Sequence, residues 1–247
     1  MILVTGGTGL LGSHLLFQLV KHGKKVRAIK RKGSNTAMVE RIFSYYSDDP
    51  HGIFSSIEWM DADILDYGAM EDALDGIEEV YHCAAVVSFD SRDHNLMKKV
   101  NTGATANLVN LCLHHKVKKF CHVSSIATLG RTDNDGVTDE ETYWKTSRKN
   151  SFYSVSKYGA EREVWRAMEE GLNAVIVNPS VILGPGFWHG NSGLFRLVDH
   201  GLKYYTEGVN GYVDVRDVAN AMILLMGEAA PESKARAPRR RSRRRRT

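Results

Sequence analysis

A hydrophobic run that leads directly into closely spaced glycines restricts the possible folds of this chain more than any other feature. Residues 2–12 read ILVTGGTGLLG, so that Gly6, Gly9 and Gly12 follow the apolar run. The next stretch, LLGSHLLFQLVKHG, repeats apolar residues at helical spacing and ends at Gly23. A buried strand, a glycine-rich turn and an amphipathic helix in this order are typical of the first unit of a parallel α/β sheet.

The rest of the chain, up to about residue 178, continues this alternation of strand and helix. Helical patterns cover about residues 93–115 and 152–170. The strand-like runs are ILVT, KKVRAIK, IEWMDAD, EEVYHCAA, KKFCHVSS and LNAVIVNP. Repeated alternation of this kind indicates a parallel sheet covered by helices on both faces. We therefore predict an α/β fold with a doubly wound parallel sheet of the Rossmann type.

The pattern changes after Asn178. The stretch PSVILGPGFWHGNSG is rich in glycine, proline and aromatic residues and is predicted to be a loop. A short helix at about 192–202, the run GYVDV and a helix at about 215–227 are expected to follow. Beyond Pro231 the sequence has no periodicity, which is typical of a disordered segment.

The composition supports a folded protein without a membrane segment. Hydrophobic residues make up 43% of the 247 residues, which is enough for a sizeable core. No signal-peptide pattern follows Met1, and no apolar run reaches the roughly 18–20 residues of a membrane span. Cys83, Cys112 and Cys121 form no metal-binding spacing, so we expect reduced thiols, no metal site and a cytoplasmic protein.

The positive net charge comes from the C-terminal end alone. The last residues read KARAPRRRSRRRRT, and removing their nine positive charges changes the formal net charge from +4 to −5. Such a tail attracts phosphate groups, but it has neither aromatic platforms nor a recognition fold. We therefore expect no specific nucleic-acid partner.

The glycine-rich turn predicts a dinucleotide site. One glycine permits the tight turn, one lets the backbone approach a pyrophosphate, and one lets helix and strand pack closely. The helix that starts at Leu10 and Leu11 directs free N–H groups and the positive end of its dipole toward the phosphates. The alternative is a glycine-rich turn that binds no ligand.

The segment YSVSK, residues 153–157, contains the candidate catalytic pair. Tyr153 and Lys157 are four residues apart, so on a helix they lie on one face. The spacing TGxxGxxG together with YxxxK resembles the short-chain dehydrogenase/reductase superfamily, in particular its extended branch. The resemblance covers about residues 1–227. It implies that Ser125, in HVSSIATLG, is the active-site hydroxyl and that Asn101, in VNTGATAN, is the asparagine of the preceding helix.

These residue types suit transfer of a proton next to a nicotinamide ring. A tyrosine has a reference pKa near 10 and is a slow acid or base at neutral pH. We expect the ammonium of Lys157 to lower the pKa of Tyr153 and to bind the nicotinamide ribose. The resemblance implies that Ser125 holds the substrate oxygen while Tyr153 supplies or accepts the proton.

The residues after the second predicted strand favour NADP over NAD. No Asp or Glu occurs between Lys24 and Val39, whereas Arg27, Lys30, Arg31 and Lys32 cluster there. A guanidinium can hold a 2′-phosphate that a carboxylate would repel. Arg31 stands where dihydroflavonol-reductase-like proteins carry their phosphate-binding arginine. The alternatives are NAD as cofactor and a solvated basic loop.

Three further segments resemble cofactor contacts of the extended branch. DADILD resembles the acidic and hydrophobic pair beside the adenine, HCAAVV resembles the fourth-strand segment that the cofactor passes, and VNPSVILGPG resembles the segment that borders the nicotinamide. The residues implied are Asp63, Ile64, Ala84, Ala85, Val86, Pro179, Ser180 and Val181.

The resemblance favours one reaction class over two others. Ile126 and Ala127 stand where dehydratases carry an Asp–Glu pair, and Leu129 replaces the tyrosine of the VYG motif common in epimerases. We therefore expect an NADP-dependent oxidoreductase acting on a small carbonyl or alcohol. The alternatives are an NAD-dependent epimerase acting on a nucleotide sugar, and a truncated cofactor-binding protein with little turnover.

The resemblance also predicts how the chain is divided. Residues 1–178 form the dinucleotide-binding domain, 179–230 a partial substrate-binding region, and 231–247 a disordered basic tail. Relatives are usually longer, so this substrate region is expected to be truncated. Relatives often dimerise through two helices, which makes a homodimer possible.

Overall fold

The computed structural model describes residues 1–130, 138–187, 198–201 and 210–227. Its main sheet has six parallel strands in the order β3-β2-β1-β4-β5-β6. The strands are β1 (Ile2–Thr5), β2 (Val26–Lys30), β3 (Glu58–Asp61), β4 (Glu79–His82), β5 (Lys119–Val123) and β6 (Ala174–Val177). Each lies within a predicted strand-like run. The predicted doubly wound parallel sheet is confirmed.

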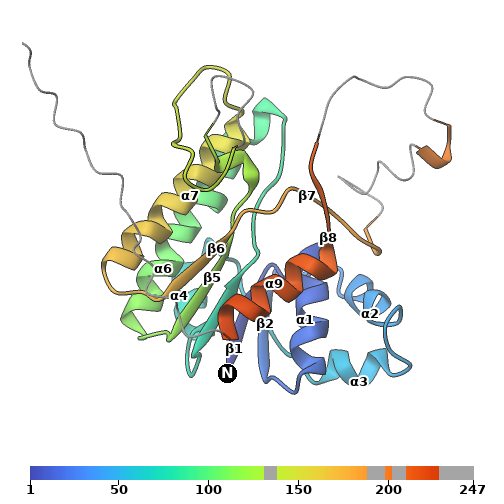
Figure 1. Ribbon diagram of the computed structural model, residues 1–247. Coiled ribbons are helices and arrows are strands. Elements are labelled where there is room, and N and C mark those ends of the chain that lie inside the picture. The colour runs from blue at the N-terminus through green and yellow to red at the C-terminus, as the bar shows by residue number, and fades with distance from the viewer. Residues whose placement is uncertain (131–137, 188–197, 202–209, 228–247) are drawn as a thin grey trace, which may run out of the picture.

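Helices cover both faces of this sheet (Figure 1). The helices between its strands are α1 (Leu10–Lys21), α2 (Ala37–Phe43), α3 (Pro50–Ser55), α4 (Tyr67–Ala73), α5 (His94–Met97), α6 (Thr105–His114) and α7 (Phe152–Glu169). Shorter helical stretches are η1 (Ser91–Asp93), the π-helical η2 (Lys98–Ala104) and η3 (Ile126–Thr128). The predicted helix at 93–115 is therefore interrupted by a π-helical stretch.

Strand residues alternate between two hydrophobic cores because successive side chains point to opposite faces. Leu3 packs into a core with α4, α6 and α7, whereas its neighbour Val4 packs into a core with α1, α2 and α9 (Val215–Gly227). Phe120 and Cys121 of β5 divide in the same way. Burying a side chain of this size contributes roughly 1.5–3 kcal/mol. The two cores therefore hold the carboxyl ends of all six strands at one edge.

A second, two-stranded parallel sheet follows β6. It pairs β7 (Val181–Leu183) with β8 (Tyr212–Asp214). The prediction of a loop for residues 179–193 is wrong at β7, because three apolar residues of that stretch find a hydrogen-bonding partner far along the chain. The helix predicted at about 192–202 falls largely outside the described residues, and the basic tail lies wholly outside them.

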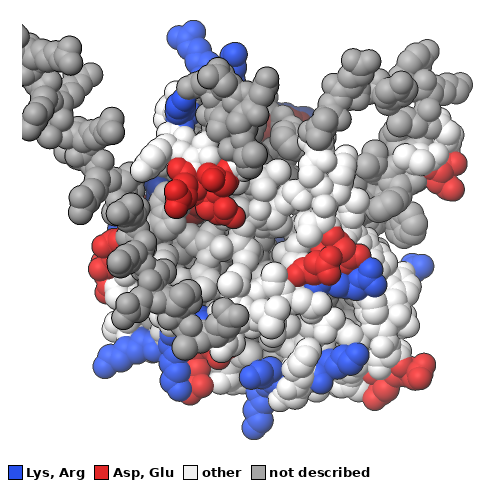
Figure 2. Space-filling model, viewed as in Figure 1, with Lys and Arg blue, Asp and Glu red and all other residues white. Residues whose placement is uncertain are grey.

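The described surface carries both signs of charge. On the face shown in Figure 2, acidic and basic side chains are interspersed with uncharged ones. Within the described ranges no helix is long and apolar enough to cross a membrane. Cys83, Cys112 and Cys121 are free thiols, and the last two are buried. No group of His, Cys, Asp and Glu suited to a metal ion occurs among the described residues.

Candidate active site

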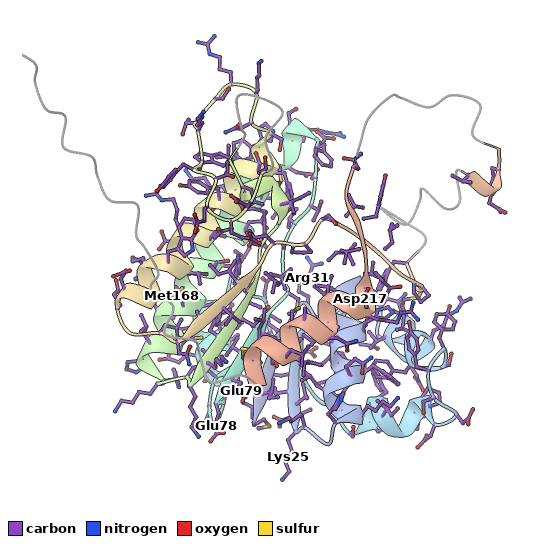
Figure 3. The ribbon with its side chains drawn as sticks, viewed as in Figure 1. Lys25, Arg31, Glu78, Glu79, Met168 and Asp217 are labelled. Atoms are coloured by element: carbon purple, nitrogen blue, oxygen red, sulfur yellow. The ribbon has the colours of Figure 1, made fainter. Side chains whose placement is uncertain are left out.

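All predicted site segments lie at the carboxyl edge of the main sheet. The strand order reverses between β1 and β4, and in open α/β sheets ligands bind outside the carboxyl ends of the strands at such a point. Figure 3 shows Arg31 toward the opposite end of the sheet from Lys25, Glu78 and Glu79, which lie where strands begin. The topology therefore brings together segments that are far apart in the sequence.

The glycine-rich turn leaves no room for side chains at two positions. Gly6 has a φ of +69°, a left-handed conformation that favours glycine. A Cβ on Gly6 would lie 2.7 Å from the backbone nitrogen of Ala84, at the end of β4. A Cβ on Gly12 would collide with the carbonyl oxygen of Gly6. Gly6 thus forms a tight turn, and Gly12 lets the start of α1 pack directly against the backbone of that turn.

The turn also fits a phosphate group. Helix α1 begins after Gly9, and within the described part of the chain its N-cap makes no side-chain hydrogen bond. The first N–H groups of an uncapped helix need an external acceptor, and they carry the positive end of the helix dipole. Leu11 is buried and Leu10 packs against the core, which holds the helix start in place. The residues present are therefore suited to a dinucleotide pyrophosphate.

A buried hydrogen-bond chain joins this turn to the next helical segment. The backbone N–H of Ala84 donates to the Thr5 hydroxyl at 3.3 Å, which contacts His82 Nδ1 at 2.7 Å. His82 Nε2 lies 2.9 Å from the Thr105 hydroxyl, which itself donates to the Asn101 carbonyl at 2.6 Å. Because the Thr105 proton is used in that way, the network assigns the His82 proton to Nε2.

Burial keeps His82 uncharged in this chain. It lowers the pKa of His82 to about 3, and the neighbouring Lys157 contributes in the same direction. His82 is thus a neutral connector between β1, β4 and the start of α6.

Asn101 connects two predicted site segments. It is 1% exposed and lies in the π-helical η2, a type of helix that is frequent at functional sites. Its amide group accepts from Val86 N at 2.8 Å and donates to Val86 O at 2.9 Å. The second amide proton goes to the Ser156 hydroxyl at 3.0 Å. Both protons of the Asn101 amide are therefore used to hold the segment after β4 against α7.

Helix α7 presents the candidate catalytic residues in one row. Its N-cap is Ser151, whose hydroxyl accepts from Ser154 N at 3.1 Å. Tyr153, Lys157 and Glu161 follow at intervals of four residues and so lie one above the other. The Ser125 side chain lies close enough to Tyr153 to influence the pKa of its phenol. The two predicted hydroxyl groups thus come from segments far apart in the sequence, the loop after β5 and the start of α7.

The predicted lowering of the Tyr153 pKa is wrong, because burial of the phenol outweighs the other influences on it. Burial raises the pKa of Tyr153 above its ordinary value, and the nearby Ser125 side chain only partly opposes this effect. The Lys157 ammonium instead donates to the Val123 carbonyl at 2.7 Å. One proton of the ammonium is thus engaged at the end of β5, and the raised pKa leaves the phenol neutral at pH 7.

Lys157 is itself perturbed by its surroundings. The residue is 2% exposed, and burial lowers its pKa to about 8. The Glu161 carboxylate is the largest opposing influence, followed by Cys83. At neutral pH the ammonium therefore keeps its proton, by a margin that depends on Glu161.

The basic residues in β2 and just after it fall into two groups. Arg27 bonds Glu58 at 2.7 Å and the Ala73 and Asp75 carbonyls at 3.0 and 2.8 Å, and Lys30 pairs with Asp61. Both of these positively charged side chains are therefore already bound to partners within the protein. Arg31 and Lys32, in contrast, are exposed and have no acidic partner among the described residues. Arg31 follows the last residue of β2 directly, so its guanidinium is available to a ligand at this edge.

The remaining predicted cofactor residues differ in their environment. Asp63 is exposed and its carboxylate accepts from Leu65 N at 2.9 Å, while Ile64 packs against a core.

The segment after β6 is held by backbone hydrogen bonds. The Pro179 carbonyl accepts from Ile126 N at 3.1 Å, which ties this segment to the loop of the active-site serine. The Val181 amide is already bonded to the Gly211 carbonyl at 3.1 Å. Ala85 is exposed and Ser180 is half-buried.

Three polar residues of the site were not predicted from the sequence. Glu161, Thr128 and Asn178 form a buried network directly behind Ser125. The only signal for Glu161 was its spacing of four residues from Lys157, which is also common on exposed helix faces. Thr128 and Asn178 had no signal beyond their positions after predicted strands.

The chain matches one protein family over nearly its whole length. Residues 2–236 match the family described as "NAD dependent epimerase/dehydratase family". Sterol demethylase protein B of Methylococcus capsulatus is 31% identical over 91% of this chain and 65% of its own length. A putative dihydroflavonol 4-reductase of Synechocystis is 29% identical over 90% of this chain and 61% of its own length. The chain therefore spans less than two thirds of these curated relatives.

A solved structure agrees with these sequence matches. The UDP-glucose 4-epimerase of Thermus thermophilus, in complex with NAD, superposes with a TM-score of 0.73 at 25% identity. The match covers 92% of this chain and 75% of the epimerase. The edge of the sheet at which the predicted residues meet thus belongs to a fold shared with a protein solved with NAD.

Proposed function

Since the chain belongs to the NAD dependent epimerase/dehydratase family, in the dihydroflavonol-reductase-like branch of the extended short-chain dehydrogenases/reductases, we propose that it is an NADP-dependent oxidoreductase. It would transfer hydride between the nicotinamide and a carbonyl or alcohol substrate. The observation that carries this proposal is the proximity of Ser125, which follows β5, and Tyr153, at the start of α7, at the edge where the glycine-rich turn lies.

Tyr153 carries a proton at neutral pH and is placed here in the role of proton donor in carbonyl reduction. When bound, the nicotinamide supplies hydride to the carbonyl carbon or accepts it from the alcohol. Ser125 would donate a hydrogen bond to the substrate oxygen, and the neutral Tyr153 hydroxyl would give that oxygen its proton, which completes the alcohol. A raised pKa keeps this proton on Tyr153 at neutral pH, so the reductive direction needs no prior ionisation.

The cofactor would be held mainly by backbone groups and Arg31. The turn that contains Gly6, Gly9 and Gly12 would take the pyrophosphate, and the segment after β4 would border the dinucleotide. Arg31 supports NADP because its guanidinium has no acidic partner among the described residues and no carboxylate directly follows β2. Lys157 would bond the nicotinamide ribose through protons that its bond to Val123 leaves over.

The likeness to the Thermus UDP-glucose 4-epimerase with NAD favours a second candidate, an NAD-dependent epimerase of nucleotide sugars. The side chains at the mouth of the site support the first candidate instead. Phe89, 80% exposed, has its ring centroid 6.2 Å from that of Tyr153, and Ile126, next to Ser125, is 45% exposed. Apolar side chains in these positions suit an apolar carbonyl compound better than a sugar. The third candidate is a cofactor-binding protein with little turnover, which a measurement of activity distinguishes from the other two.

Cofactor titration followed by a substrate screen tests these candidates. NADPH and NADH binding is measured by fluorescence, and a panel of carbonyl compounds, alcohols and UDP-sugars is then tested with wild type and Tyr153→Phe. We expect tighter binding of NADPH, oxidation of NADPH by carbonyl compounds, and a kcat about 10²–10⁴-fold lower in Tyr153→Phe with cofactor affinity retained. Interconversion of UDP-sugars without net change in the cofactor would establish the epimerase instead. Tight cofactor binding with no turnover of the whole panel would support the third candidate.

A further inference from the structure

A buried carboxylate lies directly behind the candidate catalytic residues. Glu161 is 4% exposed, although it sits on α7 and forms no ion pair with Lys or Arg in the described ranges. Its Oε2 accepts from Ser124 Oγ at 2.5 Å, Thr128 Oγ1 at 2.7 Å and Asn178 Nδ2 at 3.1 Å. Burying a carboxylate is costly unless donors replace the lost water, and these donors do so.

The donors come from the segments that shape the site. Ser124 precedes Ser125, and Thr128 Oγ1 also lies 2.8 Å from the Ser125 carbonyl. Asn178, just after the end of β6, places the same amide nitrogen 2.9 Å from Thr128 Oγ1 and 3.3 Å from the Ser125 carbonyl, so its two protons are shared among these oxygens and Glu161 Oε2. The single Glu161 carboxylate thus ties the loop of Ser125 and the end of β6 to the helix that carries Tyr153 and Lys157.

We propose that Glu161 is a positioning residue, which fixes the Ser125 loop against α7 and keeps the Lys157 ammonium charged. This inference rests on the function proposed above, because it assigns Glu161 a task within the same site. A carboxylate that served stability alone would need neither contact with the Ser125 loop nor a place one helical turn from Lys157.

The charge of Glu161 matters because Lys157 has few favourable neighbours. On α7, Lys157 lies between Tyr153 and Glu161. From the sheet, Cys83 raises its pKa, whereas the neutral rings of His82 and His122 offer it no negative charge. Burial lowers the pKa of Lys157 to about 8 even with Glu161 present. Removing the carboxylate charge is therefore expected to lower the pKa further, toward neutrality.

Glu161→Gln tests the charge, and Thr128→Val tests the tie to the Ser125 loop. Gln keeps an acceptor at the same position without the charge, and Val keeps the shape of Thr without the hydroxyl. Glu163→Gln is the matched control, since Glu163 lies on the same helix but pairs with Arg166 at 2.9 Å, away from the site. Because each change is nearly isosteric, thermal melts should confirm that the variants fold. If Glu161→Gln does not fold, Thr128→Val still tests whether the network fixes the Ser125 loop.

Two measurements do not require turnover. The first is an NMR titration of the Lys157 side chain, assigned with Lys157→Met. We expect its pKa to fall in Glu161→Gln and to stay unchanged in Glu163→Gln. The second is hydrogen exchange of the Ile126, Thr128 and Leu129 amides, which should become at least tenfold faster in Glu161→Gln and Thr128→Val.

Steady-state kinetics with the substrate found in the screen gives a third measurement. In Glu161→Gln we expect kcat to fall about tenfold or more, NADPH affinity to change less than about twofold, and the alkaline limb of the pH profile to move to lower pH. Unchanged Lys157 titration together with unchanged amide exchange overturns the proposal, and so does an active wild type whose kcat Glu161→Gln leaves intact. If the wild type is inactive, the proposed function fails. The titration and exchange measurements still test whether Glu161 fixes the Ser125 loop and keeps Lys157 charged.

Discussion

The two halves of the site are held together by different forces. In the cofactor half, made of the turns after β1 and β4 and the start of α1, backbone atoms approach so closely that a Cβ at Gly6 or Gly12 has no space. In the catalytic half, made of the loop after β5, helix α7 and the end of β6, buried polar side chains set the geometry. One half is defined by steric exclusion and the other by hydrogen bonds.

This difference determines how each half should respond to mutation. A steric requirement is local, because the clash involves backbone atoms that cannot rotate away. A hydrogen-bond network is distributed, because each donor or acceptor left unpaired in the interior has a separate cost. Changes in the cofactor half should therefore act as all-or-none effects, and changes in the catalytic half as graded ones.

The largest effect is expected for Gly12→Ala in the cofactor half. The new methyl group would meet the Gly6 carbonyl oxygen, and we expect a loss of about 3 kcal/mol or more in the free energy of unfolding, with NADPH binding lost. Urea unfolding and cofactor titration measure both quantities. Gly68→Ala is the control, since its Cβ would meet only an Asp66 carboxylate oxygen at 3.7 Å and should change stability by less than about 1 kcal/mol. Wild-type stability in Gly12→Ala would show that steric exclusion does not define this half.

Asn101→Ala tests the connection between the halves. It removes three hydrogen bonds and leaves Val86 and Ser156 without their buried partner, so we expect a loss of about 3 kcal/mol in the free energy of unfolding. Asn110→Ala removes only an exposed contact with Arg166 and should cost under about 0.5 kcal/mol. Equal stability of the two variants in urea would contradict the assigned role of Asn101.

Arg31→Ala addresses the exposed end of β2, outside the tightly packed turns of the cofactor half. If Arg31 holds a 2′-phosphate, the Kd for NADPH should rise about 10–100-fold while the Kd for NADH stays constant. Lys30→Ala is the matched neighbour, because Lys30 is already paired with Asp61, and it should change either Kd by less than about threefold. A parallel loss of affinity for both cofactors in Arg31→Ala would place the guanidinium elsewhere than at the 2′-phosphate.

The smallest effect is a pH dependence in the catalytic half. The pKa of Lys157 is about 8 in the folded chain and near its ordinary, higher value when unfolded, so the folded state binds fewer protons between these values. Stability contributed by this group therefore rises with pH from about 8 to about 10.5 and is constant below that window. Comparing urea unfolding at pH 7.5 and 10, we expect wild type to gain about 1–2 kcal/mol relative to Lys157→Met. A constant difference between the two proteins would rule out a buried, perturbed Lys157.

The sequence predicted the cofactor half more completely than the catalytic half. Backbone turns that exclude side chains require glycine, so the positions of the glycines in ILVTGGTGLLG indicate the geometry of the turn. Tyr153 and Lys157 were recognisable from their spacing, and Ser125 from its place after a strand. The direction of the Tyr153 pKa was predicted wrongly, because the spacing of two residues does not tell how deeply a phenol is buried or what else binds the ammonium.

The sequence alone determined the alternation of strands and helices in the main sheet, the glycine-rich turn and the candidate hydroxyl and amino groups on the β5 loop and α7, because periodicity and glycine requirements are local properties of the chain. The tertiary structure decided which of those groups are buried and whom they bind. It committed Lys157 to Val123, left Arg31 exposed while engaging Arg27, and assembled Glu161 with Thr128 and Asn178. These outcomes depend on distances between residues far apart in the sequence and on the exclusion of water, and neither is encoded by any single segment.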